Sequence, residues 1–142
     1  MSIFTYHLIE LPFFEAVRRI FLSPISKATK GIVHSEYMTA MTLGAPIFST
    51  SRVLIGQVAV FVQWENENAL ENYLEQDSFG KILAKGWHAR LSFIRKWGKF
   101  SGFKLSNNKD QLESQNSPVI AVTIARIKPL AVPRFIHWGR PV

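Results

Sequence analysis

Histidine gives this chain its widest choice of chemistry, because a neutral imidazole can accept a proton, donate one or bind a metal ion. The 142-residue sequence contains four histidines, which are His7, His34, His88 and His137, and it contains no cysteine. No two histidines have the spacing of a zinc-binding helix motif, so we expect no metal site. The lack of cysteine also excludes disulfides and cysteine nucleophiles, and it fits a reducing, cytoplasmic location.

His34 and Glu36 are separated by one residue within a segment of strand-like composition. Alternate side chains of a strand point to the same face, so this pair is expected to lie side by side. A histidine oriented by a carboxylate is an arrangement used in general-base catalysis. An ordinary solvent-facing strand would show the same pattern, so the sequence assigns no catalytic residue.

His88 lies in the run GWHAR (86–90), on or beside the second predicted helix. Its neutral imidazole is a candidate axial ligand of haem, and Arg90 or Arg95 would then pair with the haem propionates. The alternative is a surface or half-buried histidine that caps a break in the helix. Haem is the one cofactor that these residues suggest.

Tryptophan side chains supply candidates for a substrate pocket, because apolar and aromatic residues line most small-molecule sites. Trp64 and Trp87, together with His34, are the candidate pocket residues for an apolar small molecule. The alternative is a role in the hydrophobic core. The helical spacing of Trp87 with Leu91 and Ile94 favours that alternative.

Hydrophobic periodicity predicts the elements that would position these side chains. Strands are expected where apolar and β-branched residues alternate, and helices where apolar residues recur every three or four positions. Asn66 is the expected N-cap of the second helix, which would end at Gly98 after a break at 78–80 or at Gly86. The predicted order is a strand at 3–11, a helix at 12–21, strands at 31–43 and 53–64, a helix at 66–97 and a short strand at 100–105.

This order is that of a ferredoxin-like βαββαβ unit, so residues 1–105 are predicted to form one α+β domain of the dimeric α+β barrel type. In such a unit the helices cover one face of an antiparallel sheet, and the open sheet face needs another cover. We expect that cover to be a second copy in a homodimer, or a missing second half of the protein.

The C-terminal part of the chain differs in character. Residues 106–117 are polar, which predicts a surface linker. Residues 118–127 are expected to form a strand, followed by a short helix. Because Lys128-Pro129-Leu130 is similar to Leu11-Pro12-Phe13, residues 118–142 are predicted to begin an incomplete second unit. The alternative is a C-terminal strand that adds to the edge of the first sheet.

The formal net charge is +7, and the charges are segregated along the chain. Acidic residues cluster at 65–77, whereas residues 78–109 carry eight basic residues and no acidic one: Lys81, Lys85, Arg90, Arg95, Lys96, Lys99, Lys104 and Lys109. Such a segment is compatible with a surface for nucleic acid or an anionic membrane. The alternative is complementarity with helix dipoles, with acids in early turns and bases in late turns. We expect no signal peptide and no membrane span.

Five short motifs carry a resemblance to a known family. They are MTLGAP at 41–46, GWHAR at 86–90, RKWG at 95–98, AVTIARI at 121–127 and PRF at 133–135. These motifs resemble proteins related to spheroidene monooxygenase, a carotenoid-oxygenating family. The resemblance implies a ferredoxin-like fold, an internal duplication and haem-dependent oxygenation, with His88 as haem ligand. Full members are longer, so it also implies that a site built between two halves would lack one wall here.

Three hypotheses about function remain open at this point. The first is a monooxygenase-like protein that binds haem and an apolar, carotenoid-like substrate, inactive if it is truncated. The second is a non-catalytic α+β domain that dimerises or binds a ligand. The third is binding of nucleic acid or peripheral contact with an anionic membrane, although no sequence signature of a nucleic-acid-binding module supports the nucleic-acid form.

Overall fold

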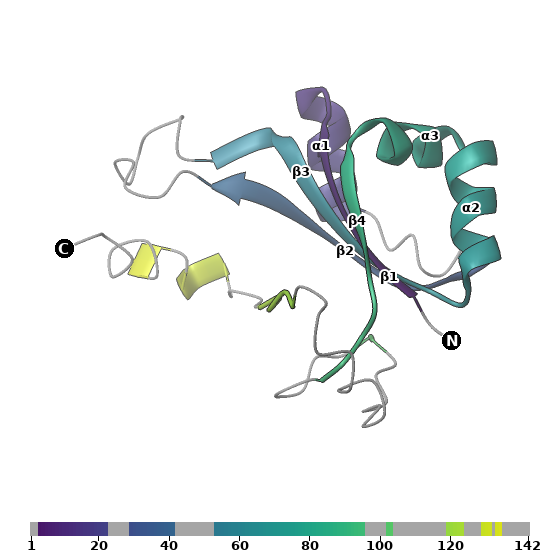
Figure 1. Cartoon of the computed structure of the whole chain (residues 1–142). Coiled ribbons are helices and arrows are strands. Elements are labelled where there is room, and N and C mark those ends of the chain that lie inside the picture. Colours follow the sequence, from purple (N-terminus) through teal and green to yellow (C-terminus); the bar gives the residue numbers. More distant parts are fainter. Residues whose placement is uncertain are drawn as a thin grey trace.

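The computed structural model of the chain describes residues 3–22, 29–41, 53–95, 102–103, 119–123, 129–131 and 133–134. Within these ranges, four strands form one antiparallel sheet (Figure 1): β1 (Ile3–Glu10), β2 (Ile32–Met41), β3 (Val53–Trp64) and β4 (Trp87–Leu91). Their order across the sheet is β2-β3-β1-β4. Each helical connection therefore joins two strands that are separated by one other strand, as in the split βαβ arrangement. The predicted ferredoxin-like α+β fold is confirmed.

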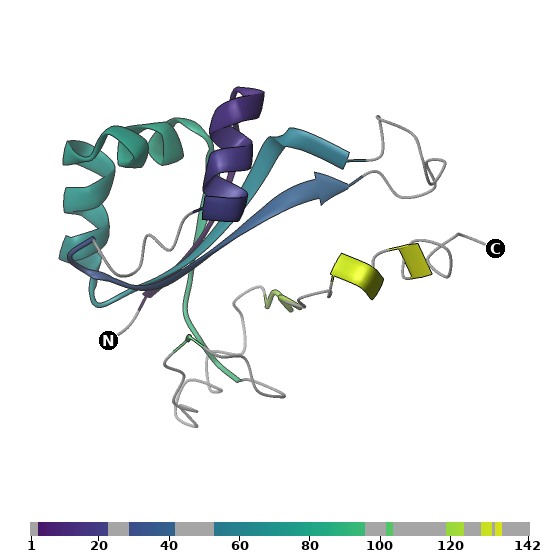
Figure 2. The same cartoon turned by 180° about the vertical axis from the view of Figure 1, so that it is seen from behind.

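Three α-helices in the described part of the chain cover one face of this sheet (Figures 1 and 2): α1 (Phe13–Leu22), α2 (Glu67–Gln76) and α3 (Ser78–Lys85). The core lies between these helices and the sheet. Its buried members are Ile9, Leu11, Ala16, Ile32, Val58, Val60, Val62, Trp64, Leu70, Tyr73, Leu74, Phe79 and Leu83. The predicted alternation on β1 and β3 is confirmed, since odd positions of β1 and even positions of β3 enter this core.

We call the opposite side of the sheet the helix-free face. It carries Phe4, Tyr6, Leu8 and Glu10 from β1, Gln57, Ala59, Phe61 and Gln63 from β3, His34, Glu36 and Met38 from β2, and Trp87, Ala89 and Leu91 from β4. One end of this face is buried and the other is exposed. Phe4 and Phe61 are 4% and 9% exposed, whereas Leu8 and Trp87 are 43% and 61% exposed.

Two capping residues set the helices that lead to β4. Asn66 accepts a hydrogen bond from the Ala69 amide at 2.9 Å, which confirms it as the N-cap of α2. Asp77 ends α2 and begins α3. Its amide donates to the Tyr73 carbonyl at 3.1 Å, and its carboxylate accepts from the amides of Phe79 and Gly80 at 2.8 and 3.1 Å. The predicted break in the helix therefore occurs at a helix-to-helix junction.

The closing strand lies earlier in the chain than the periodicity predicted. α3 ends at Lys85, and residues 87–91 form β4, so the predicted continuation of the helix through this segment is wrong. Gly86 makes the junction, because a Cβ atom there would collide with the Leu8 carbonyl and the Ile9 side chain of β1. Trp87 and Leu91 are four residues apart, a spacing that fits both a helix and alternate strand positions. Of the predicted strand at 100–105, only residues 102–103 are described, and they are not in a strand.

The C-terminal segment is described in part. Residues 119–123 have no regular secondary structure, and Pro129–Ala131 forms a 3₁₀ helix, η3. The rest of the predicted strand at 118–127 and the whole linker at 106–117 lie outside the described residues. The division into a unit at 1–105, a linker and a second unit stays a prediction.

Candidate functional site

The most chemically capable pair on the helix-free face is His34 and Glu36 of β2. Their pairing with Gln63 and Phe61 of β3 places both side chains on that face, as the sequence predicted. The Nε2 atom of His34 lies 2.6 Å from Oε1 of Glu36, and the two side chains are 16% and 14% exposed. A register shift between Ile32 and His34 precedes the pair and turns the strand so that Ile32 enters the core.

This contact assigns the roles of the two imidazole nitrogens of His34 as hydrogen-bond donor and acceptor. A carboxylate only accepts hydrogen bonds, so Nε2 carries the proton and its N–H donates a hydrogen bond to Glu36. In the neutral ring, Nδ1 is then the proton acceptor. The described residues provide no hydrogen bond to Nδ1. The pair therefore has the form of a general base whose orientation is held by a carboxylate.

An aromatic cluster surrounds His34. The ring of Phe103 meets the His34 ring edge-on, with centroids 4.5 Å apart, and lies 5.4 Å from Phe61. Phe4 stacks on Phe61 at 5.7 Å and lies 5.8 Å from Phe93. The base is thus set in an apolar, aromatic wall, which suits an apolar aromatic or conjugated molecule.

Gly102 holds the Phe103 segment against His34. Its φ angle of 112° is in the region that favours glycine, and a Cβ atom there would collide with the imidazole ring. The sequence placed this segment in a closing strand and gave it no part in a site. No local signal reveals it, because the contact joins positions almost seventy residues apart.

The candidate haem ligands lie elsewhere. His88 is on β4, opposite His7 of β1, and its ring stacks on the His7 ring with centroids 5.3 Å apart. The Nδ1 atom of His88 donates to the Gly86 carbonyl at 3.2 Å. Arg90 bridges two carboxylates of α2, Glu67 at 2.9 Å and Glu71 at 2.6 Å. Arg95 is exposed beyond the end of β4.

Whether haem binds here stays a prediction. The His7 ring covers one face of the exposed His88 ring, but a metal ion binds an imidazole nitrogen in the plane of that ring, so the stacking does not decide for or against haem. Arg90, the nearest candidate for a propionate, is already paired with Glu67 and Glu71. Among the described residues, no group of three or more His, Asp or Glu side chains could hold a metal ion.

The predicted pocket residues do not share a pocket. Trp64 is fully buried on the helix side, where its Nε1–H donates to Oγ1 of Thr5 at 2.8 Å. It is a core residue because the alternation of β3 points it away from His34. Trp87 is on the helix-free face, against Tyr6 at 6.3 Å, but on the opposite edge strand. Three strand spacings, or about 14 Å across the sheet, and four residues along the strands separate it from His34.

Sequence reasoning did not single out His7, which is fully buried beside the core. Its Nδ1–H donates to the Leu83 carbonyl at 3.3 Å, and its Nε2 atom has no hydrogen-bond partner among the described residues. Burial lowers the pKa of His7 from 6.5 to about 4; the hydrogen bond to the Leu83 carbonyl opposes this lowering, and the neighbouring His88 adds to it. The alternation with Thr5 and Ile9 was the available signal for this position.

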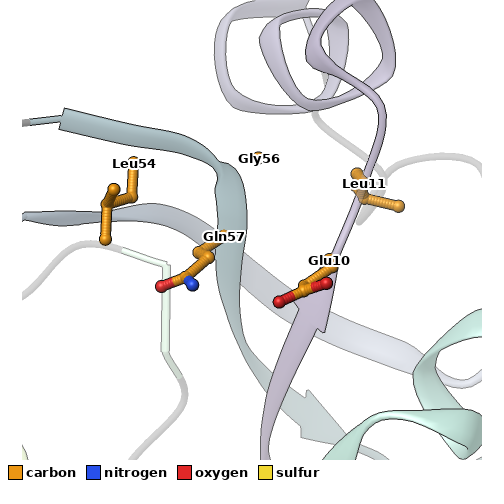
Figure 3. Close-up of a pocket in the computed structure, with 5 residues that line it drawn as sticks. All are labelled: Glu10, Leu11, Leu54, Gly56 and Gln57. Carbon is orange, nitrogen blue, oxygen red and sulfur yellow. The ribbon is translucent and has the colours of Figure 1, made fainter. Parts of the chain in front are cut away.

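A second feature of the helix-free face lies at its exposed end. Glu10, Leu11, Leu54, Gly56 and Gln57 line a shallow pocket of about 270 Å³. Figure 3 shows the carboxylate of Glu10 and the amide of Gln57 pointing to the same side, away from α1. Gln57 and Gln63 are six residues apart on β3, so this pocket is about 20 Å along the sheet from His34.

The basic stretch at 78–109 is only partly described. Lys81 and Lys85 are exposed on α3, and Lys85 is in the last turn, where helix-dipole complementarity places it. Glu67 in the first turn of α2 follows the same pattern. No helix in the part of the chain that the structure describes is long and apolar enough to cross a membrane.

The chain matches no protein-family model, and no curated protein is similar to it in sequence. Among solved structures, it is similar to an ethyl tert-butyl ether D (EthD) family protein from Bacillus halodurans, with a TM-score of 0.39 and 13% identity. The similarity covers 66% of this chain and 100% of that one. A likeness this low adds no weight, so the fold rests on the strand order and connections given above.

Proposed function

We propose that this chain binds an apolar small molecule with an acidic proton at the His34 end of the helix-free face, and that His34 accepts the proton. The observation that carries the proposal is the 2.6 Å contact between His34 and Glu36 within the aromatic cluster of Phe4, Phe61 and Phe103. Suitable substrates are phenols and enolisable ketones, whose conjugated rings match this wall.

The carboxylate of Glu36 and the imidazole of His34 have different roles in this proposal. Glu36 holds the imidazole by accepting a hydrogen bond from Nε2–H, and it stabilises the imidazolium that forms when Nδ1 takes a proton from the substrate. The aromatic neighbours exclude water, which strengthens both interactions. A narrower form of this proposal is oxygenation of the deprotonated molecule by dioxygen, the reaction class that the motif resemblance implies. One oxygen atom would then enter the substrate as a carbonyl and the other would leave as water, with the substrate supplying the electrons. Haem has no part in it because the candidate haem ligand His88 lies on the opposite face of the sheet from His34.

A coloured phenol tests the proposal directly. Bound 4-nitrophenol is expected to show the visible absorption of its phenolate at a pH where the free dye is mostly neutral. The variant His34→Gln should lose that absorption, and Glu36→Gln should reduce it. His88→Gln is the matched control and should leave it unchanged. Equal phenolate absorption in wild type and His34→Gln, or no bound dye at all, would contradict the proposal.

A further inference from the structure

The shallow pocket at the far end of the helix-free face is lined by charged, polar and apolar groups, and these groups indicate which kind of ligand would fit it. Glu10 is exposed and contributes a carboxylate, and Gln57 contributes an amide. Leu54, which is 36% exposed, contributes apolar surface beside them. An exposed carboxylate next to an exposed leucine suits a cation carried next to an apolar side chain.

The C-terminal segment of this chain offers such a pair. Leu130 in η3 is 97% exposed, and Arg134 is exposed four residues later. The two side chains are thus an exposed apolar group and an exposed cation close together in the chain. Arg134 forms no ion pair with any described residue, and the sequence from Pro118 to Val142 contains four basic residues and no acidic one.

The rest of the described segment is also unpacked. Val119, Ile120 and Val122 are 76%, 62% and 43% exposed. Figures 1 and 2 both place residues 119–123 and 129–131 on the side of the sheet that carries no helix. Apolar side chains this exposed in a run without charge are typical of a surface that another chain covers.

We propose that Leu130 and Arg134 of a second copy of this chain dock in the pocket formed by Glu10, Leu54 and Gln57. Arg134 pairs with Glu10 and Gln57, and Leu130 packs on Leu54. Since each copy carries both the pocket and the segment, the exchange is reciprocal and closes as a two-fold dimer. The segment does not fill the pocket of its own chain, where Leu130 is almost fully exposed. The proposal does not depend on the function proposed for His34.

Cross-linking shows whether the segment that docks in the pocket belongs to a second copy or to the same chain. Because the sequence contains no cysteine, only the introduced cysteines can react. Two chains with different tags would carry Gln57→Cys and Ala131→Cys respectively, and a short bismaleimide would be added to their mixture. A product with the summed mass of the two tagged chains is expected. The pair Phe14→Cys with Ala131→Cys is the control, because the exposed Phe14 lies on α1, on the helix side. No product, or one that forms only within a chain carrying both cysteines, would overturn the proposal.

Charge reversal tests the recognition itself. In sedimentation velocity, Glu10→Arg and Arg134→Glu should each weaken the dimer about 10-fold or more, since each opposes two like charges. The double variant Glu10→Arg with Arg134→Glu should restore it. Lys81→Glu, an exposed reversal on α3, should have no effect. The proposal would be contradicted if the wild-type chain were monomeric at all concentrations. It would also be contradicted if the single variants dimerised as the wild type does.

Discussion

His7 and His88 face each other across β1 and β4, with their rings stacked at a centroid distance of 5.3 Å and an angle of 26°. Only one of the two is enclosed. His7 is fully buried with an unpartnered Nε2 atom, whereas His88 is exposed. The edge strand β4 therefore pairs with β1 beside a buried histidine whose pKa is lowered by burial, which favours the neutral ring.

Folding stability is expected to fall on acidification because of His7. The pKa of His7 is lowered from 6.5 to about 4 in the folded chain, so the unfolded chain binds a proton first as the pH drops. The contribution is complete above pH 6.5 and is lost between pH 6.5 and 4, by about 3 kcal/mol in all. Urea unfolding at several pH values measures this slope. His7→Gln should flatten it and His88→Gln should leave most of it; an unchanged slope in His7→Gln would refute the assignment.

The hydrogen bond from Trp64 to Thr5 is expected to stabilise the core. Both residues are fully buried, and Thr5→Val keeps the volume while leaving the indole N–H without an acceptor. The variant should lower the free energy of unfolding by about 1–3 kcal/mol. Thr39→Val is a suitable comparison, because the Thr39 hydroxyl bonds the Leu54 carbonyl at an exposed site. Equal losses in the two variants would show that burial has no special effect here.

Gly102→Ala is expected to displace the Phe103 segment from His34. The new Cβ atom would strain the backbone at a φ angle of 112° and would collide with the imidazole. The proton signal of His34 Cε1 in NMR should then lose the ring-current shift caused by Phe103. Phe103→Leu should move the same signal in the same direction. A His34 signal that is unaffected by both variants would mean that the segment does not contact it in solution.

The Asp77 cap is expected to matter through its oxygen and not its charge. Asp77→Ala removes the acceptor of the Phe79 and Gly80 amides and should cost about 1 kcal/mol of stability. Asp77→Asn keeps an oxygen in place and should cost only a few tenths of this. Thermal unfolding compares the two variants. An asparagine variant as unstable as the alanine variant would point to an electrostatic role instead.

Much of the fold follows from local pattern. Strict alternation around Val58, Val60 and Val62 identified both faces of β3, and the same rule placed His34 beside Glu36. These predictions succeeded because the strand period acts on neighbouring residues. The place of β4 failed since Trp87 and Leu91 satisfy either period. The collision that forbids any side chain at Gly86 depends on Leu8, which is distant in sequence.

The candidate site was harder to predict from the sequence, because its contacts also join residues that are distant in the chain. Trp64 and His34 are both prominent in the sequence, yet the sheet puts them on opposite faces. Phe103 reaches His34 only after the chain has passed through the strands β3 and β4 and the two helices between them. The burial of His7 and the pairing of Arg90 with Glu67 and Glu71 are likewise tertiary facts. Residue types could suggest these side chains, but only the three-dimensional fold decides which of them meet.

Gly86 has a consequence for the order in which the chain comes apart. α3 passes into β4 through this one residue, whose backbone is in close contact with Leu8. Because only this residue lies between α3 and β4, the strand cannot separate from the sheet edge without displacing the last turn of the helix. Helix and edge strand should therefore open as a single cooperative unit, and their amide hydrogens should exchange with deuterium at a common rate. An edge that would otherwise fray is in this way anchored to the interior of the protein.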